Sequence, residues 1–199
     1  PWAKHNRRAA MSARPMETQM KHLIPRAMIL ALTPFLFLVT AMTAASATPL
    51  VDAGWLSGKL NDDKLVLIDL RNKIDGGSYD TYLEGHIPSA VHSDYLKDGW
   101  RVGRGDVVGL LPEAAQFEAL ARKLGVSADS HVVLVPAGVS STDFGSSARA
   151  YWTFKIFGHD KVSILDGGYA DWKAAYPGQI ETGAPVAPAP GDFTARFQP

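Results

Sequence analysis

The sequence lacks cysteine entirely. This absence excludes disulfide bonds, thiolate metal sites and thiol nucleophiles within the 199 residues given. The sequence also lacks an excess of either charge, because 20 basic side chains balance 20 acidic ones. A balanced charge carries no signature of nucleic acid or of an acidic membrane as a partner, so neither is expected.

Long hydrophobic runs are scarce, and the longest lies near the start. Residues 27–41 are mostly apolar, a short basic stretch precedes them, and small residues at 45–47 follow. This order is typical of a secretory signal peptide. A membrane anchor is the alternative, but Pro34 interrupts the run, which is shorter than the roughly 20 residues that a spanning helix needs. We therefore predict a signal peptide at residues 21–47, export to the bacterial periplasm, and no membrane attachment after cleavage.

Residues 1–20 do not fit this pattern, because they are basic and polar and begin with proline instead of methionine. Translation could start at any of three methionines, Met11, Met16 and Met20. We interpret residues 1–20 as a mis-called extension of the gene and leave residues 1–47 out of the fold prediction.

Apolar residues make up 46% of the chain, which is enough to build a core. Short apolar runs bounded by polar residues are typical of strands that are buried on both faces. Such strands are predicted at residues 65–68, 90–91, 132–135 and 162–165. Parallel sheets carry their chemistry at the carboxyl ends of strands, so we expect any site in the loops after Ile68, Val135 and Leu165.

Helical spacing of apolar side chains alternates with these strands. Helices are predicted from a cap at Asp52 through Leu60, as a turn at residues 79–83, from Pro112 to Leu124, at residues 148–157, and from Tyr169 to the residue before Pro177. Strands that alternate with helices predict an α/β fold, with a central parallel sheet and helices on both faces.

Proline is concentrated after this region. Residues 181–190 contain three prolines, which favour an extended polyproline conformation. Phe193 and Phe197 then alternate with polar residues, as at the start of a further strand or packed segment. We interpret residues 181–199 as a Pro/Ala-rich linker toward a second domain that is missing from the sequence.

Three strings of residues stand out within the predicted domain. They are Val-Leu-Ile-Asp-Leu-Arg at residues 66–71, Tyr-Leu-Glu-Gly-His-Ile-Pro-Ser-Ala-Val at residues 82–91, and residues 158–168 ending in Asp-Gly-Gly and followed by Trp172. These strings resemble, in order, the Asp-x-Arg strand end, the Glu-Gly-His-Ile-Pro-Gly-Ala-Val segment and the closing strand and turn of the rhodanese family. Ser89 replaces a glycine of that pattern. The resemblance implies that residues 50–180 form a rhodanese-like fold.

Two of the strings contain charged pairs. Asp69 and Arg71 share one face of an extended strand end, and we interpret them as a pair that fixes the exit of the strand, not as catalytic groups. Glu84 and His86 would suit acid/base chemistry or a metal, but no other histidine has ligand spacing with them. We interpret His86 as structural, hydrogen bonded to backbone and carboxylate, and expect no metal and no cofactor.

The string Asp166-Gly167-Gly168 has two interpretations. Paired glycines could cradle a phosphate, but a turn from a strand into a helix needs the same glycines. We favour the turn for these residues.

The loop after residues 131–135 is where the resemblance implies catalysis. In active rhodaneses this loop begins with a cysteine, whose thiolate takes the outer sulfur of a donor such as thiosulfate as a persulfide, while loop amides stabilise the negative charge. The cysteine position falls here at Pro136, which has no nucleophile and no amide hydrogen. A serine without an assisting base is a poor sulfur acceptor, so the chain alone is predicted to be inactive. The equivalent loop, expected to be longer than the catalytic one, continues through Ala137, Gly138, Val139, Ser140 and Ser141.

Residues 145–152 resemble the helix after the longer loop in the inactive first domain of tandem rhodaneses. In such proteins the second domain carries the cysteine. This implies that Arg149 and loop residues 137–144 face a cleft between domains, although a solvated helix arginine is an equal alternative for Arg149. The sequence therefore predicts the non-catalytic first domain of an exported thiosulfate or 3-mercaptopyruvate sulfurtransferase. Its partner would be the second rhodanese domain of the same protein.

A stand-alone function is the alternative. A cysteine-free rhodanese-like domain could dock a protein, or bind an anion such as a small sulfur oxyanion at the amides of residues 138–142. One observation would distinguish the two interpretations. If the chain is part of an enzyme, we expect the gene to encode a second domain after residue 199.

Overall fold

The computed structural model describes residues 47–198. The predicted extension at residues 1–20 and nearly all of the predicted signal peptide at residues 21–47 therefore lie outside the described residues. Within residues 47–198, no helix combines the length and the apolar composition that crossing a membrane requires.

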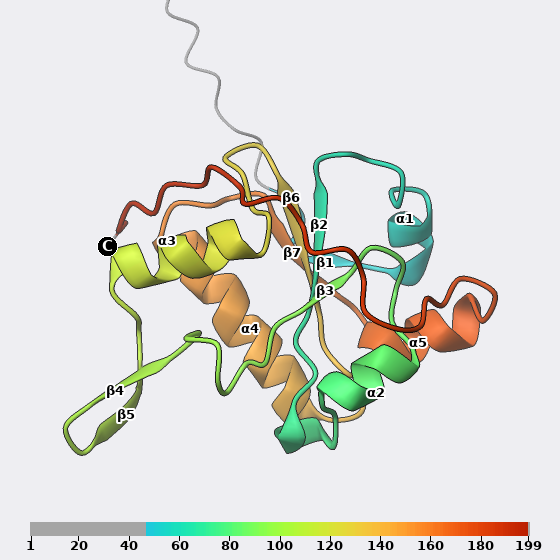
Figure 1. Cartoon of the computed structure of the whole chain (residues 1–199), viewed down its shortest axis with the longest axis horizontal. Coiled ribbons are helices and arrows are strands. Elements are labelled where there is room, and N and C mark those ends of the chain that lie inside the picture. The colour runs from blue at the N-terminus through green and yellow to red at the C-terminus, as the bar shows by residue number, and fades with distance from the viewer. Residues whose placement is uncertain (1–46, 199) are drawn as a thin grey trace, which may run out of the picture. The chain divides into compact units, whose positions relative to one another are not determined.

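A parallel sheet of five strands forms the centre of the domain (Figure 1). Its order is β1-β7-β6-β2-β3, and every neighbouring pair is parallel. The predicted α/β fold with a central parallel sheet is confirmed, although β1 was not foreseen. The strands are β1 (Leu50–Val51), β2 (Leu65–Asp69), β3 (Val91–His92), β6 (His131–Val135) and β7 (Val162–Leu165).

The central strands are apolar at successive positions because both of their faces are covered. Along β6, Val132 and Leu134 belong to one core cluster, whereas Val133 and Val135 belong to another. Successive side chains of a strand point to opposite faces, so each face needs its own apolar residues. β2 pairs with β6 in register up to Asp69 opposite Val135, which brings the carboxyl ends of both strands to one edge.

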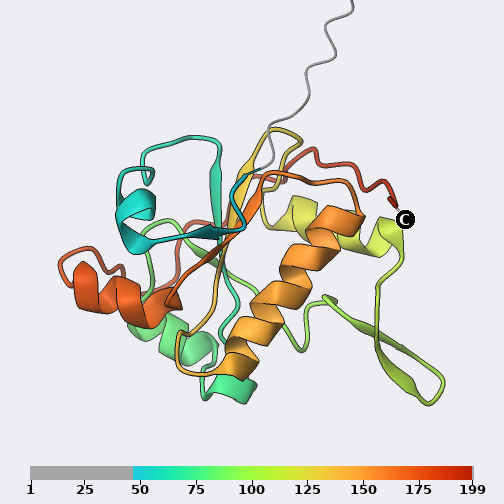
Figure 2. The same ribbon diagram turned by 180° about the vertical axis from the view of Figure 1, so that it is seen from behind.

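Helices cover both faces of the sheet. They are α1 (Ala53–Ser57), α2 (Tyr79–Glu84), α3 (Ala114–Lys123), α4 (Ser141–Ile156) and α5 (Gly168–Ala175). Figures 1 and 2 show α1 and α5 on one side of the sheet and α3 and α4 on the other. Phe117 and Phe154 fill the core beneath α3 and α4, and Leu56 and Trp172 fill the core beneath α1 and α5.

The start of α4 differs from the prediction. The helix begins at Ser141 instead of residue 148, so the loop after β6 covers only residues 136–140. Ser140 caps the helix, because its hydroxyl accepts a hydrogen bond from the Asp143 amide while the Asp143 carboxylate accepts one from the Ser140 amide. The predicted helix start at residue 148 is therefore wrong. The Ser-x-x-Asp spacing is a local signal that marks this helix start in the sequence.

Two other helix boundaries differ by a few residues. Asp52 caps α1 as predicted, since its carboxylate accepts from the Trp55 amide at 2.7 Å, but the helix ends at Ser57 and does not reach Leu60. Pro112 lies just before Glu113, the cap residue of α3, and not in the first turn of that helix.

The connection between β3 and α3 contains a hairpin that was not predicted. Its strands are β4 (Val102–Arg104) and β5 (Val107–Leu110), which pair antiparallel. Figure 1 shows the hairpin projecting away from the sheet. Val107 and Val108 in it are exposed, so these apolar residues do not contribute to either core cluster.

The segment after α5 returns across the domain and packs onto it. Phe193 is only 3% exposed, and its ring lies 6.0 Å from that of Phe117. Arg122 of α3 holds this segment, because its Nε donates to the Phe193 carbonyl at 2.7 Å and its own carbonyl accepts from the Gly191 amide at 2.9 Å. Figure 1 shows the segment running alongside α3. The expectation of a packed segment around Phe193 is thus confirmed.

This packing makes a prediction for stability. Phe193→Ala should lower the free energy of unfolding by about 3–5 kcal/mol, because it removes a buried aromatic ring and leaves a cavity. Phe197→Ala is the matched control, since this ring is 59% exposed and its loss should cost less than about 1 kcal/mol. Urea unfolding followed by tryptophan fluorescence measures both. Equal losses would show that the segment is not part of the core.

Candidate functional site

The carboxyl ends of β6 and β7 bring together two of the loops in which the sequence predicted the site. The loop after β6 lies against the turn that opens α5, because the Tyr169 amide donates to the Pro136 carbonyl at 2.9 Å and the Ala170 amide donates to the Ala137 carbonyl at 3.0 Å. A hollow of about 270 Å³ lies at this contact. Its lining consists of Pro136, Gly138, Ser140, Asp143, Phe144, Gly167 and Gly168.

The Asp143 carboxylate occupies the inside of the loop. Its Oδ2 accepts hydrogen bonds from the amides of Gly138 at 2.6 Å and Val139 at 3.1 Å. Its Oδ1 accepts from the amide of Ser140 at 2.8 Å and from the hydroxyl of the same residue at 3.0 Å. Asp143 is 2% exposed. The sequence predicted that amides in this loop could bind an external anion, but the amides of Gly138, Val139 and Ser140 bind the Asp143 carboxylate instead. Asp143 is a site residue that the sequence analysis missed.

These hydrogen bonds keep Asp143 ionised. Burial alone would raise the pKa of its carboxyl group, but the hydrogen bonds from Val139, Ser140 and Gly138 outweigh that effect, and the pKa lies below its ordinary value. An external anion would have to displace this carboxylate or approach it against like-charge repulsion. The structure therefore disfavours the predicted anion site at residues 138–142.

The hydroxyls of the loop are not arranged as nucleophiles. The Ser140 hydroxyl donates to Asp143, and Ser141 is the first residue of α4. In the described part of the chain, no histidine is hydrogen bonded to either serine. With Pro136 at the head of the loop, the residues that line the hollow include no thiol. Residues 141–144, expected in the loop, form the first turn of the helix.

The Asp166-Gly167-Gly168 turn is explained by close packing between the two loops. Gly167 and Gly168 have φ angles of 69° and 59°, which favour glycine. A Cβ at Gly168 would lie 2.4 Å from the Pro136 carbonyl oxygen, and a Cβ at Gly138 would lie 2.0 Å from the Gly167 carbonyl oxygen. Asp166 is exposed, and its amide donates to the Val51 carbonyl at 2.8 Å. This geometry fits the interpretation as a turn from a strand into a helix.

Asp69 and Arg71 form a buried ion pair at the end of β2. Nη2 of Arg71 lies 2.8 Å from Oδ2 of Asp69, and its Nε lies 3.0 Å from both carboxylate oxygens. The same Nη2 donates to the Gly85 carbonyl at 2.8 Å. The guanidinium carbon lies 4.0 Å from the centre of the Tyr169 ring. The pair therefore ties the end of β2 to α2 and α5, as its structural interpretation requires.

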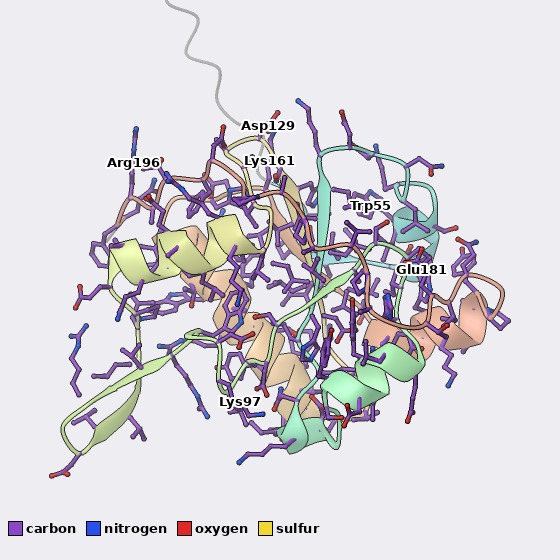
Figure 3. The ribbon with its side chains drawn as sticks, viewed as in Figure 1. Trp55, Lys97, Asp129, Lys161, Glu181 and Arg196 are labelled. Carbon is purple, nitrogen blue, oxygen red and sulfur yellow. The ribbon has the colours of Figure 1, made fainter. Side chains whose placement is uncertain are left out.

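Glu84 and His86 do not form an acid/base pair. Glu84 is exposed at the end of α2, whereas His86 is 1% exposed and stacks on the Tyr82 ring at 4.1 Å. The Nδ1 of His86 lies 3.0 Å from the Tyr82 carbonyl, and its Nε2 lies 3.8 Å from Oε2 of Glu181. Glu181, labelled in Figure 3, comes from the segment after α5. Within residues 47–198, no group of three or more candidate ligands is arranged to hold a metal.

Arg149 contacts a hairpin that the sequence did not predict. It is half-buried, and its Nη2 donates to the Gly109 carbonyl at 3.1 Å. Its guanidinium carbon lies 4.7 Å from the centre of the Trp152 ring. Arg149 therefore holds the β4–β5 hairpin onto α4, and it makes no contact with the loop after β6 that the structure records.

Removing the internal anion should destabilise the domain. Asp143→Ala leaves three partly buried amides without their acceptor, so we expect the free energy of unfolding to fall by about 1–3 kcal/mol. Asp171→Ala on α5 is the control, because Asp171 is exposed and its loss should cost less than about 1 kcal/mol. Urea unfolding at neutral pH compares the two. A loss no larger than that of the control would contradict the importance of this contact.

The same contact predicts a dependence on pH. The pKa of Asp143 is lower in the folded state than the value of about 3.9 expected in the unfolded chain. Its contribution to stability is therefore full above the unfolded value and is lost as pH falls through the folded value. The free energy of unfolding should fall more steeply between about pH 5 and pH 2 for the native chain than for Asp143→Asn. Parallel slopes in urea titrations across this range would count against the assignment.

Comparisons with known proteins identify relatives of the region that contains this site. The model of the Rhodanese-like domain matches residues 52–175. The 3-mercaptopyruvate sulfurtransferase of Escherichia coli (strain K12) is 35% identical over 160 residues, which cover 77% of this chain and 53% of that protein. The 3-mercaptopyruvate sulfurtransferase of Homo sapiens is 32% identical over 164 residues, which cover 80% of this chain and 47% of that protein. The chain thus spans about half the length of these relatives.

Solved structures agree with this likeness. The crystal structure of SseA from Escherichia coli, a 3-mercaptopyruvate sulfotransferase by its description, matches with a TM-score of 0.63 and 33% identity, over 77% of this chain and 57% of that chain. The 3-mercaptopyruvate sulfurtransferase from Leishmania major matches with a TM-score of 0.58 over 77% of this chain and 43% of that chain, and at 22% identity it shows the fold alone. The chain belongs to the family of rhodanese-like domains and is homologous to sulfurtransferases.

Proposed function

We propose that this chain is a non-catalytic rhodanese-like domain of an exported sulfurtransferase. In the complete protein, a second rhodanese-like domain carries the reactive cysteine. Its thiolate attacks the outer sulfur of thiosulfate, with cleavage of the S–S bond and loss of sulfite, or the thiol sulfur of 3-mercaptopyruvate, with cleavage of the C–S bond and loss of the pyruvate enolate, which is then protonated. The resulting persulfide passes its outer sulfur to a thiophilic acceptor. The domain described here takes no part in the sulfur transfer itself, and it contributes a surface that packs against the second domain.

The observation that carries this proposal is the state of the loop after β6. Pro136 stands where the family places a thiol, and the amides behind it are bound to the Asp143 carboxylate. A sulfur oxyanion would meet a negative charge in the place where a catalytic loop offers amide hydrogens. Both requirements of the reaction, a nucleophile and an open anion site, are therefore absent from this loop.

Support for a second domain as the partner comes from the relatives and from the surface. The matched relatives are about twice as long as the region that this chain covers. Val139 and Phe144 lie on either side of the Asp143 contact and are 65% and 40% exposed. Exposed large apolar side chains in and beside the loop suit coverage by another protein surface. The signal-like residues 21–47 support export to the periplasm.

The proposal predicts that the chain alone does not transfer sulfur. A thiosulfate:cyanide assay of the pure chain should give no thiocyanate above the buffer blank, because no thiolate is present. Sequencing of the gene beyond residue 199 should show a second rhodanese-like domain with a cysteine at the head of its loop. Turnover by the pure chain would overturn the non-catalytic role, and a stop codon directly after Pro199 would favour a stand-alone domain.

A cysteine alone should not restore activity. Pro136→Cys is expected to remain inactive, because Asp143 still occupies the loop amides and repels an anionic donor. Adding Asp143→Ala to Pro136→Cys should increase the thiosulfate-dependent gain of one sulfur atom, read by mass spectrometry with and without a reductant. Equal sulfur uptake by the single and double variants would contradict the role given to Asp143.

A further inference from the structure

A cavity away from the loop after β6 has no role in the proposed sulfur transfer. It has a volume of about 670 Å³ and lies between α2, β3, the end of α3 and the proline-containing segment at residues 185–190. Ligand pockets in proteins have volumes of roughly 300–1,000 Å³, with mostly apolar walls and a few polar groups. This cavity has that size, so its lining decides what it could bind.

One wall of the cavity is the proline-containing segment, which is held at both ends. Glu181 and His86 exchange backbone hydrogen bonds at 2.9 Å, and the Gly183 amide donates to the Leu83 carbonyl at 2.7 Å. At the other end the Gly191 amide donates to the Arg122 carbonyl at 2.9 Å. Figure 1 shows the segment crossing in front of the sheet between α5 and α3. The wall is therefore a bridge between two fixed points, and not a free tail.

The charged groups of the lining are of one sign. Its two charged side chains are those of Arg122 and Lys123, and no acidic residue lines the cavity, although the whole chain has equal numbers of acidic and basic side chains. Arg122 is paired with Glu118, whose Oε1 lies 3.0 Å from its Nη2. Lys123 is exposed and has no ion pair within residues 47–198. This charge is complementary to an anionic head group.

The opposite wall offers an aromatic surface. Tyr79 stacks on Tyr82 with ring centres 5.7 Å apart and planes 18° apart, and Tyr79 remains 50% exposed. Its ring lies 5.4 Å from that of His92, whose Nε2 donates to the Arg71 carbonyl at 2.8 Å. That hydrogen bond leaves Nδ1 of His92 for another partner. A flat apolar group between Tyr79 and Pro188 would bury surface on both sides.

A neighbouring hollow shows which end would receive an anion. It shares Val91, Pro185 and Pro188 with the cavity and contains His86 and Glu181. Nε2 of His86 is buried without a hydrogen-bond partner, and the Oε2 of Glu181 accepts from the Ser89 amide at 3.0 Å. The Glu181 carboxylate repels an anionic head, so such a head is directed to the end of the cavity that Lys123 occupies.

We propose that this cavity binds a small organic carboxylate with an aromatic body. The carboxylate lies at Lys123 and Arg122, and the body lies between Tyr79 and the proline-containing wall. The site is separate from the loop after β6, so its occupation does not depend on the sulfur chemistry of the complete protein.

Titration of the full chain with 3-phenylpropionate, followed by amide resonances in a ¹⁵N-labelled sample, tests this proposal. The uncharged 3-phenylpropionamide is the matched probe. We expect saturable shifts around Val91 and Lys123, with the carboxylate binding about fivefold to tenfold more tightly than the amide, because one charge-assisted contact is worth that much. Ala119→Trp should abolish binding, since Ala119 is an exposed residue of the lining and a large ring there fills the cavity.

Two lysine variants separate this site from a general charge effect. Lys123→Gln should reduce the preference for the carboxylate to less than about twofold. Lys173→Gln on α5 removes the same charge far from the lining and should leave the preference unchanged. Absence of saturable shifts up to about 10 mM, equal binding of both probes, or undiminished binding to Ala119→Trp would each overturn the proposal. None of these outcomes bears on the thiosulfate:cyanide assay.

Discussion

A single carboxylate joins the end of β6 to the start of α4. Asp143 accepts hydrogen bonds from three successive amides and from the hydroxyl of its own cap residue, Ser140. Buried amides need an acceptor, and an ionised acceptor is the strongest available without a ligand. The loop is thereby stable without an anion, and its shape depends on a side chain that remains charged. The hydrogen bonds that Asp143 accepts therefore hold the loop in place and also occupy its amides.

The rest of the edge is built as a rigid support around that contact. Gly138 and Gly168 allow two loop backbones to touch, and the Asp69–Arg71 pair fastens β2 to the helices beside them. These features give the domain the family's architecture without using the family's nucleophile. Packing of the backbone and sulfur transfer require different atoms, so the fold of this edge does not depend on a nucleophile in the loop.

The segment after α5 contributes to the core and also forms one wall of the cavity described above. Phe193 completes the core beside α3, and the prolines before it close a cavity with basic and aromatic walls. Residues that the sequence suggested as a linker thus contribute both to stability and to a candidate binding surface. Glu181, at the start of this segment, also supplies the carboxylate nearest to His86. The end of the domain lies beyond α5, since these contacts belong to its interior.

Local patterns in the sequence were sufficient for four of the five strands of the sheet and for the absence of a thiol. The continuous apolar runs of β2, β6 and β7 reflect burial on both faces, and the cap at Ser140 was readable from its spacing to Asp143, although it was overlooked. Tertiary structure alone decided that His86 lies near Glu181 and that Arg149 holds a hairpin. The physical reason is that periodicity and capping depend on neighbours along the chain. Contacts between distant segments depend instead on how the whole core packs, and no short stretch of sequence contains that information.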